Sequence, residues 1–146
     1  MLEKIKDIIL KNDLCVLATV SRGEPHCSLM SYVPDEEGRE IYLVSHRATR
    51  KYLNLVQNPS VSLLIDTRED KAGQDRIKIK ALTINGEFQA INEPFKKDSI
   101  RSRFLKQHPH LKDFLNDPGS DIFSIRFKSF QLLDGVKDIS IETLEK

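Results

Sequence analysis

The pattern of hydrophobic and polar residues at the start of the chain is that of an amphipathic helix. Apolar residues recur at helical spacing among charged ones and predict a helix over residues 2–11; they are Leu2, Ile5, Ile8 and Ile9. Asn12 and Asp13 are typical of a turn and would end this helix. The chain therefore opens with a short helix that has one apolar face to bury.

A β-hairpin is predicted directly after this helix. The runs 14–20 and 25–33 are rich in apolar and β-branched residues, and the turn sequence Ser21–Glu24 joins them. With the turn centred in that segment, Ala18 faces Cys27 across the strand pair. The register of the hairpin follows from the turn alone.

The rest of the chain is predicted to alternate between strands and helices. A turn over 34–38 leads to a strand over 40–45, for which an antiparallel meander with the hairpin is the simplest arrangement. The later elements are a helix around 50–57, a strand over 61–65, an exposed loop over 66–76, a long strand over 77–91 bent at Gly86, a helical region over 93–117 broken at His108-Pro109, a strand over 121–133, and a polar tail from Lys137 with weak helical character. Six strands with inserted helices predict a small closed antiparallel β-barrel, since closure removes exposed edges.

Neither the two cysteines nor the sequence His108-Pro109-His110 predicts a cross-link or a metal site. In the hairpin register, Cys15 points to the opposite face of the sheet from Cys27, so we expect two buried thiols and no disulfide. The two histidines lie at a helix break and have no carboxylate or cysteine at the usual ligand spacing, which favours a structural or surface role.

The composition predicts one globular domain over residues 1–146. A chain of this length buries roughly 70% of the surface that it exposes when unfolded, and 39% of its residues are hydrophobic. Lys plus Arg is 23 and Asp plus Glu is 22, so the net charge of +1 argues against a nucleic-acid partner. The sequence contains no run of about 18 apolar residues, the length that would span a membrane. Its charged N-terminus is unlike a signal peptide. We therefore expect a cytoplasmic protein.

The charges are unevenly distributed along the chain. The segment from Ile41 to Ile65 contains no Asp or Glu, and cations and hydroxyls gather at its predicted strand-to-helix junction: Ser45, His46, Arg47, Thr49, Arg50 and Lys51. A helix N-terminus offers unpaired N–H groups and the positive end of the helix dipole, and both favour an anion such as phosphate. The alternative is that these cations are solvated or pair with acids from another segment. The residues alone leave this choice open.

The same segment resembles the core of a known family. The run Tyr42–Ile65 combines a strand that ends in Ser, a short basic segment, a helix with an Asn-Leu pair and then Asn-Pro-Ser-Val. Ala18-Thr19, Pro25–Leu29, Arg103–Pro109 and Asp121–Phe127 fit the same pattern in order and spacing. Over nearly the whole chain, the sequence resembles the pyridoxamine 5′-phosphate oxidase-related, FMN-binding split-barrel superfamily. It is most similar to the branch of the haem-utilisation proteins, without their C-terminal extension.

This resemblance implies a fold, a cofactor and a partner. The fold is mainly β with inserted helices, a six-stranded antiparallel split β-barrel, and two copies form a homodimer with FMN in a groove between the subunits. The residues implied at the FMN phosphate are Arg50 and Lys51, with the hydroxyls of Ser45 and Thr49; Arg47 joins them as part of the basic junction. The strand whose backbone would lie along the isoalloxazine ring carries Cys27, Ser28, Leu29 and Met30.

Several positions differ from the oxidases within this superfamily. Cys27 and Tyr32 stand near the places of an Arg and a Lys, Ala81 replaces a Gln, and the chain has no Trp. We therefore expect no oxidation of pyridoxamine phosphate. The favoured hypothesis is an FMN-binding flavoprotein, a small oxidoreductase of unknown substrate. The alternative is a non-catalytic module that binds flavin or haem in the same groove. His26 and His46 flank this site and either contact the flavin or only pack.

Overall fold

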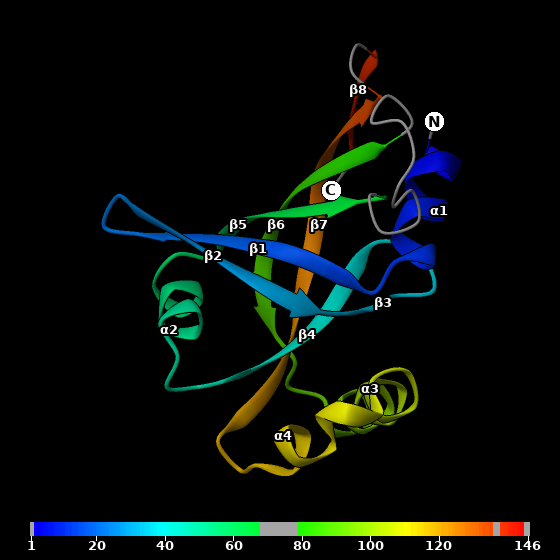
Figure 1. Ribbon diagram of the computed structural model, residues 1–146. Helices are drawn as coiled ribbons and strands as arrows, with labels where there is room; N and C mark the ends of the chain where they lie inside the picture. Colours follow the sequence, from blue (N-terminus) through cyan, green and yellow to red (C-terminus); the bar gives the residue numbers. More distant parts are fainter. Residues whose placement is uncertain (1, 68–78, 136–137, 145–146) are drawn as a thin grey trace.

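The strands of this computed structural model form one curled antiparallel sheet (Figure 1). The structure describes residues 2–67, 79–135 and 138–144. The elements are α1 (Leu2–Lys11), β1 (Leu14–Ser21), β2 (Glu24–Ser31), β3 (Val33–Pro34), β4 (Glu40–His46), α2 (Arg50–Gln57), β5 (Ser60–Asp66), β6 (Lys80–Ala90), α3 (Pro94–Gln107), the 3₁₀ turn η2 (Pro109–Leu111), α4 (Lys112–Asn116), β7 (Ser120–Asp134) and β8 (Asp138–Thr143). Most of the loop predicted over 66–76 and the first residues of the strand predicted over 77–91 lie outside the described residues.

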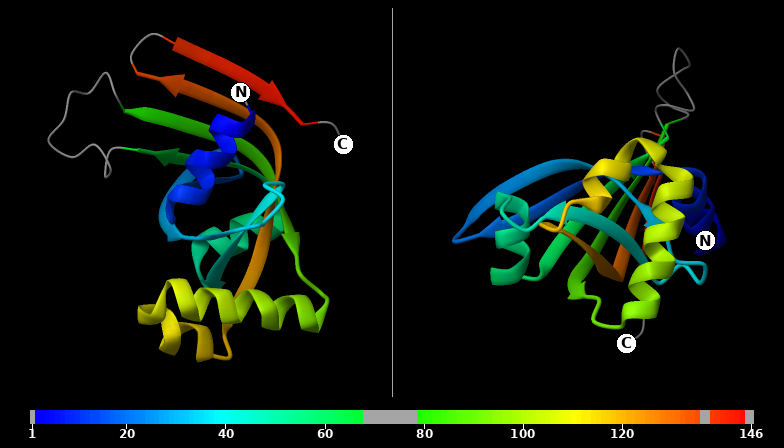
Figure 2. Two further views of the ribbon diagram at one scale, coloured as in Figure 1. Left: turned by 90° about the vertical axis from the view of Figure 1, so that its right-hand side faces the viewer. Right: turned by 90° about the horizontal axis from the view of Figure 1, so that it is seen from below.

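The strand order brings the two edges of the sheet together. The strands follow the order β2-β1-β5-β6-β7-β4-β3, with β8 beside β7. β2 and β3 stand at opposite ends of this order, although only Tyr32 separates them along the chain. The sheet therefore has to curl until its edges meet, which closes a barrel in the way the pattern predicts (Figures 1 and 2). The predicted fold class, an antiparallel split barrel with inserted helices, is confirmed.

Tyr32 holds the point at which the barrel closes. Its side chain is fully buried, its hydroxyl donates to the carbonyl of Ile9 at 2.6 Å, and its N–H donates to the carbonyl of Asp13 at 2.9 Å. Its own carbonyl lies 3.0 Å from Nε2 of the buried His108. The structural role predicted for His108 is thus confirmed, and among residues 2–67, 79–135 and 138–144 no group of three or more potential ligands is placed to hold a metal.

Three expectations about the strands are wrong in detail. The described residues form eight strands instead of six, because the strand expected over 25–33 is interrupted at Tyr32 and residues 138–143 of the tail form β8. The tail is a strand because Ile139 and Ile141 alternate with polar residues, the period of a strand, and β7 offers an open edge. Of the predicted meander, the structure contains only the short pairing of β3 with β4 among the described residues. The longer ladder of β4 is with β7.

The predicted register of the hairpin is confirmed. Ala18 lies opposite Cys27, and both cysteines are free. Cys15 is buried as expected, whereas Cys27 is exposed, which corrects the expectation of two buried thiols. The reason is the alternation of the strand: Cys15 faces the barrel interior with Leu17, and Cys27 therefore faces outward.

Two separate hydrophobic cores support the sheet. The larger fills the barrel and includes Leu17, Leu43, Leu63, Leu82, Phe123 and Ile125. The smaller lies on the outside of β4 and β7, where α3 and α4 cover the sheet, and its members include Tyr42, Val44, Ile100, Phe104 and Ile122 (Figure 2). No helix within the described residues is long and apolar enough to cross a membrane.

Candidate functional site

The start of α2 is built by two hydroxyl side chains. Thr49 is the N-cap of α2, and its Oγ1 accepts from the N–H of Tyr52 at 3.3 Å. Ser45, at the end of β4, is fully buried, and its Oγ lies 2.9 Å from Thr49 Oγ1. Thr49 Oγ1 also donates to the carbonyl of His46 at 2.9 Å. These two predicted site residues therefore shape the helix start, and their hydroxyls form hydrogen bonds within it.

Two predicted cations, Arg50 and Lys51, occupy the first turn of α2. This turn contains no acidic residue, so its positive dipole end has no internal counter-charge. Arg50 lies 2.9 Å from a carboxylate oxygen of Glu24 on β2, but both side chains are more than half exposed and such pairs contribute little. Lys51 is half-buried, and its side chain forms no ion pair or hydrogen bond with any residue of the described ranges. Within the described residues it is therefore an unpaired cation at a helix N-terminus.

A groove separates α2 from the turn of the hairpin. It has a volume of about 560 Å³, within the usual range of ligand sites, and its lining includes Arg22, Glu24, Arg50, Leu53 and Asn54. The buried Asn54 amide donates to Thr19 on β1 at 3.1 Å and fixes the helix against the barrel. The groove therefore lies between α2, which is held against the barrel, and the turn that joins β1 to β2.

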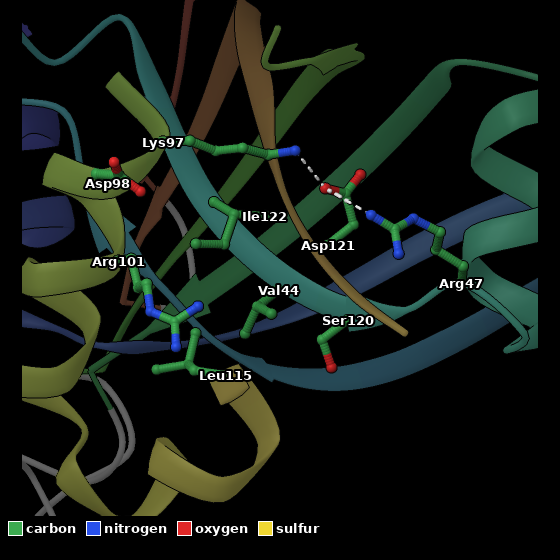
Figure 3. A pocket seen from close by; sticks show the side chains of 9 residues that line it. All are labelled: Val44, Arg47, Lys97, Asp98, Arg101, Leu115, Ser120, Asp121 and Ile122. Atoms are coloured by element: carbon green, nitrogen blue, oxygen red, sulfur yellow. Dashed lines mark ion pairs between the residues drawn. The ribbon is translucent and has the colours of Figure 1, made fainter. Parts of the chain in front are cut away.

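Arg47 does not join Arg50 and Lys51 at the start of α2. It points toward β7, where its Nη1 donates to the carbonyl of Pro118 at 2.9 Å and its Nη2 lies 3.6 Å from Oδ1 of Asp121 (Figure 3). The buried Asp121 carboxylate also accepts from the Tyr52 hydroxyl at 2.8 Å and lies 2.7 Å from Nζ of Lys97. Asp121 thus ties α2, β7 and α3 together.

The sequence pattern did not reveal Asp121. It begins the last predicted strand, far along the chain from Arg47, and no local signal links the two. The alternative left open above was that these cations are solvated or pair with acids from another segment, and its second part holds for Arg47 and, at the surface, for Arg50. Lys51, by contrast, pairs with no acid of the described residues.

The environment of Asp121 makes folding stability depend on pH. Burial raises the pKa of this carboxyl, but hydrogen bonds from Lys97 and Tyr52 and the charges of Lys97 and Arg47 outweigh it and lower the pKa below its usual value of 3.8. Asp121 therefore stabilises the fold above the pKa of the unfolded chain, and this contribution is lost as the pH falls through the lower folded pKa.

Replacing Asp121 with Asn is expected to cost about 1–3 kcal/mol at pH 7, because it leaves two cations without their counter-charge. Urea unfolding at pH 7 and at pH 3 would measure this, and the gap between wild type and variant should shrink at the lower pH. Asp113→Asn, at an exposed carboxylate on α4, is the matched control and should change little at either pH. An equal gap at both pH values would contradict the assigned role.

The predicted ring-binding strand presents its residues on two faces. Met30 faces the barrel interior and is buried, and Ser28 shares that face, opposite Leu17. Cys27 and Leu29 face outward, and Leu29 is 70% exposed. A ligand lying along β2 would meet the side chains of one face only, whereas the backbone that the resemblance implies as its contact runs through all four residues.

The outward face of the barrel is uncharged over several strands. By alternation from the buried residues, it carries Val16, Ala18, Cys27, Leu29, Ser62, Leu64, Thr83, Asn85, Ser129, Gln131, Ile139 and Ile141, with Asp66 at one end. Ser62 donates to Asn85 at 2.7 Å, and Asn85 donates to Ser129 at 3.3 Å, so the polar members bond to one another. Leu29, Ile139 and Ile141 are all more than 60% exposed.

The two histidines near the site lie in different surroundings. His26 is opposite Thr19 on the inner face of the hairpin and is half-buried. His46 Nδ1 accepts from the N–H of Ala48 at 3.2 Å, and its Nε2 lies 3.9 Å from a carboxylate oxygen of Asp117. His46 therefore packs at the helix start, and His26 lies on β2, the strand predicted to bind the flavin ring.

Known proteins are similar to this chain in sequence and in fold. The family model described as pyridoxamine 5′-phosphate oxidase matches residues 1–134. General stress protein 26 of Bacillus subtilis (strain 168) is 26% identical over 132 residues, which make up 90% of this chain and 87% of that protein.

Two solved structures are similar in fold. A heme binding protein from Mycobacterium smegmatis has a TM-score of 0.84 at 18% identity, covering 97% of this chain but only 57% of that one. A FAD-binding protein from Mesorhizobium loti has a TM-score of 0.72 at 20% identity, covering 90% of this chain and 91% of that one. With a family model that extends from the first helix through the last long strand of a curled barrel, the chain belongs to the pyridoxamine 5′-phosphate oxidase family.

Proposed function

We propose that this protein binds FMN, with the phosphate of the cofactor at the start of α2. The observation that carries the proposal is Lys51, a half-buried cation with no partner in the described residues, in a helix turn that contains no acid. A dianionic phosphate there would meet the helix dipole, the ammonium of Lys51 and the guanidinium of Arg50 together. Glu24 would have to release Arg50, which costs little for an exposed pair.

The family supports a flavin in particular. The FAD-binding protein from Mesorhizobium loti shares the fold over almost its whole length. Because Arg47 is tied to Asp121, Arg50 and Lys51 are left at the start of α2 for a phosphate, and the single terminal phosphate of FMN suits these two cations. When bound, the flavin would supply hydride or electron transfer, which makes a small oxidoreductase of unknown substrate the function we favour.

The ring of the cofactor would lie along β2, and a second copy of the chain would cover it. The uncharged outward face described above extends from the β1–β2 pair across the sheet to β8, and it carries exposed Leu29 at one end and exposed Ile139 and Ile141 at the other. Surfaces of this kind are typical of contacts between subunits. The protein is therefore proposed to be a homodimer with its cofactor site at the subunit interface.

A second candidate is a non-catalytic module that holds haem in the same groove. The similarity to the heme binding protein from Mycobacterium smegmatis favours it, and carboxylates of a haem could use the same cations. The absorbance spectrum of the purified protein separates the two candidates, since flavin absorbs near 450 nm and haem gives an intense band near 400 nm.

Replacing Lys51 with alanine is expected to weaken FMN binding roughly 10- to 100-fold, since a hydrogen bond to a charged group contributes about 1.5–3 kcal/mol. Quenching of flavin fluorescence during a titration would measure the dissociation constant. Lys106→Ala is the matched control, because Lys106 is an exposed lysine on α3 and its loss changes the net charge equally. Equal weakening by both substitutions would mean that only net charge matters, and would contradict a phosphate site at Lys51.

A further inference from the structure

The backbone of Arg47 lies directly at the start of α2. Arg47 is a central residue of the tight turn from His46 to Thr49, in which the Thr49 N–H donates to the His46 carbonyl at 3.2 Å. Thr49 caps α2. Ala48, the residue between Arg47 and the cap, lines the groove beside α2 together with Arg50. The chain therefore brings a third cation to the edge of the proposed phosphate site.

The side chain of Arg47 is nevertheless held away from this site by the turn that precedes β7. Its Nη1 donates to the carbonyl of Pro118 at 2.9 Å, and its Nη2 lies 3.6 Å from Oδ1 of Asp121. The N–H of Arg47 also donates to the carbonyl of Gly119 at 2.9 Å. Figure 3 shows the guanidinium pointing toward Asp121. Asp121 is the charged member of these three partners, so it is the one that draws the charge of Arg47 toward β7.

Asp121 itself lies beside the start of α2. It stands opposite Ser45 in the pairing of β4 with β7, and the Ser45 hydroxyl lies 2.9 Å from that of the N-cap residue Thr49. The Asp121 carboxylate is buried and accepts from the hydroxyl of Tyr52, in the first turn of α2, at 2.8 Å. A negative charge so placed repels an anion at the same helix start, since buried charges are screened less than exposed ones.

We propose that Asp121 is a specificity-determining residue that limits how strongly the start of α2 binds phosphate. Its own charge opposes the anion, and it keeps Arg47 out of the site, so that Arg50 and Lys51 are the cations left there. This inference rests on the proposed binding of FMN. Asp121 then sets the preference for FMN over a flavin that lacks the phosphate, although it does not itself contact the cofactor.

A purely structural role for Asp121 predicts a different result. The carboxylate interacts with Arg47, Lys97 and Tyr52, so its loss would loosen the start of α2. A loosened helix start would bind the phosphate less well or equally well, and the affinity ratio of FMN to riboflavin would fall or stay constant. Under the proposal this ratio rises while the protein loses stability, because the site loses a repelling charge and gains the guanidinium of Arg47. The sign of the change separates the two roles.

Isothermal titration of the full chain with FMN and with riboflavin tests this inference. Asp121→Asn should raise the affinity ratio of FMN to riboflavin about threefold to tenfold, the effect of one charge acting through a partly hydrated region. Asp113→Asn, at an exposed carboxylate on α4, changes the net charge equally and should leave the ratio unchanged. An unchanged or lower ratio in the Asp121 variant, or an equal rise in both variants, would overturn the inference.

Arg47→Gln identifies the source of the change. In the wild-type protein it should leave the affinity ratio unchanged, since the guanidinium is held by Pro118 and Asp121. In the Asp121→Asn background it should remove most of the gain. A loss in the single variant as large as that caused by Lys51→Ala would mean that Arg47 already binds the phosphate, and would overturn the inference. This single variant keeps Asp121 in place, so it tests the proposal even if Asp121→Asn is too unstable to titrate.

The two proposals fail in different ways. Equal affinities of the wild-type protein for FMN and riboflavin would contradict the phosphate site itself and, with it, the role of Asp121. A clear preference of the wild type for FMN that Asp121→Asn does not raise would leave the phosphate site in place and overturn only the role of Asp121.

Discussion

Phe104→Ala is expected to lower the free energy of unfolding by about 3–5 kcal/mol, the largest effect of any substitution considered in this chain. Phe104 is fully buried on α3 and belongs to the smaller core, between this helix and the outer face of β4 and β7. Truncation of Phe104 would leave a cavity in this small cluster, because its few neighbouring side chains cannot repack to fill the space. Urea-induced unfolding followed by circular dichroism would measure the change.

The same helix offers a matched control. Phe95 is also on α3, but its side chain is 83% exposed. Phe95→Ala should therefore change the free energy of unfolding by no more than about 0.5 kcal/mol. Similar losses in the two variants would mean that α3 does not pack on the barrel as described, and the second core would have to be abandoned.

Gly86→Ala is expected to destabilise the protein by about 3 kcal/mol, because it overpacks a site bounded by backbone. Gly86 lies at the bulge where the pairing of β6 with β7 shifts register. A Cβ atom there would stand 2.6 Å from the carbonyl oxygen of Arg126 and 2.8 Å from a methyl group of Ile125. The strand itself would have to move to make room. Thermal or urea unfolding of the variant measures the cost.

Gly119→Ala is the control that separates the clash with backbone at Gly86 from the loss of a glycine as such. A Cβ at Gly119 would come as close as 2.2 Å to His46, but the obstacle is a side chain that is 40% exposed and can rotate away. The Gly119 variant should therefore lose less stability than the Gly86 variant, and His46→Ala should restore part of what it loses. If Gly86→Ala were the milder of the two, the bulge would not be as tightly closed as the structure indicates.

The hydrophobic pattern predicted the elements well where local spacing determines them. The helix over 2–11, the hairpin with Ala18 opposite Cys27 and the bend at Gly86 all follow from periodicity or turn residues, and the structure confirms them. The closure of the barrel at Tyr32 could not be predicted in this way, because it depends on contacts with Ile9, Asp13 and His108 that are distant in sequence. β8 was missed because its short polar run acquires its partner only from the free edge of β7.

The candidate site also combines features that local sequence predicts with features that depend on contacts distant in sequence. The basic junction at the start of α2, with Thr49 as its cap, could be read from neighbouring residues. The pairing of Arg47 could not be predicted in this way, because its partner Asp121 lies far along the chain. Ser45 is a similar case: its position suggested a phosphate ligand, whereas its hydroxyl bonds to Thr49 within the protein. Charge and spacing locate such a site, but the tertiary contacts decide which of its groups are free.

Comparing FMN with riboflavin isolates the phosphate that the start of α2 is proposed to recognise. Riboflavin has the same ring and ribityl chain but no phosphate. Isothermal titration of the purified, cofactor-free protein should give FMN at least about tenfold higher affinity than riboflavin, because two charge-assisted contacts are lost without the phosphate, and Lys51→Ala should reduce that ratio. Equal affinities for the two flavins, or no binding of either, would contradict the account.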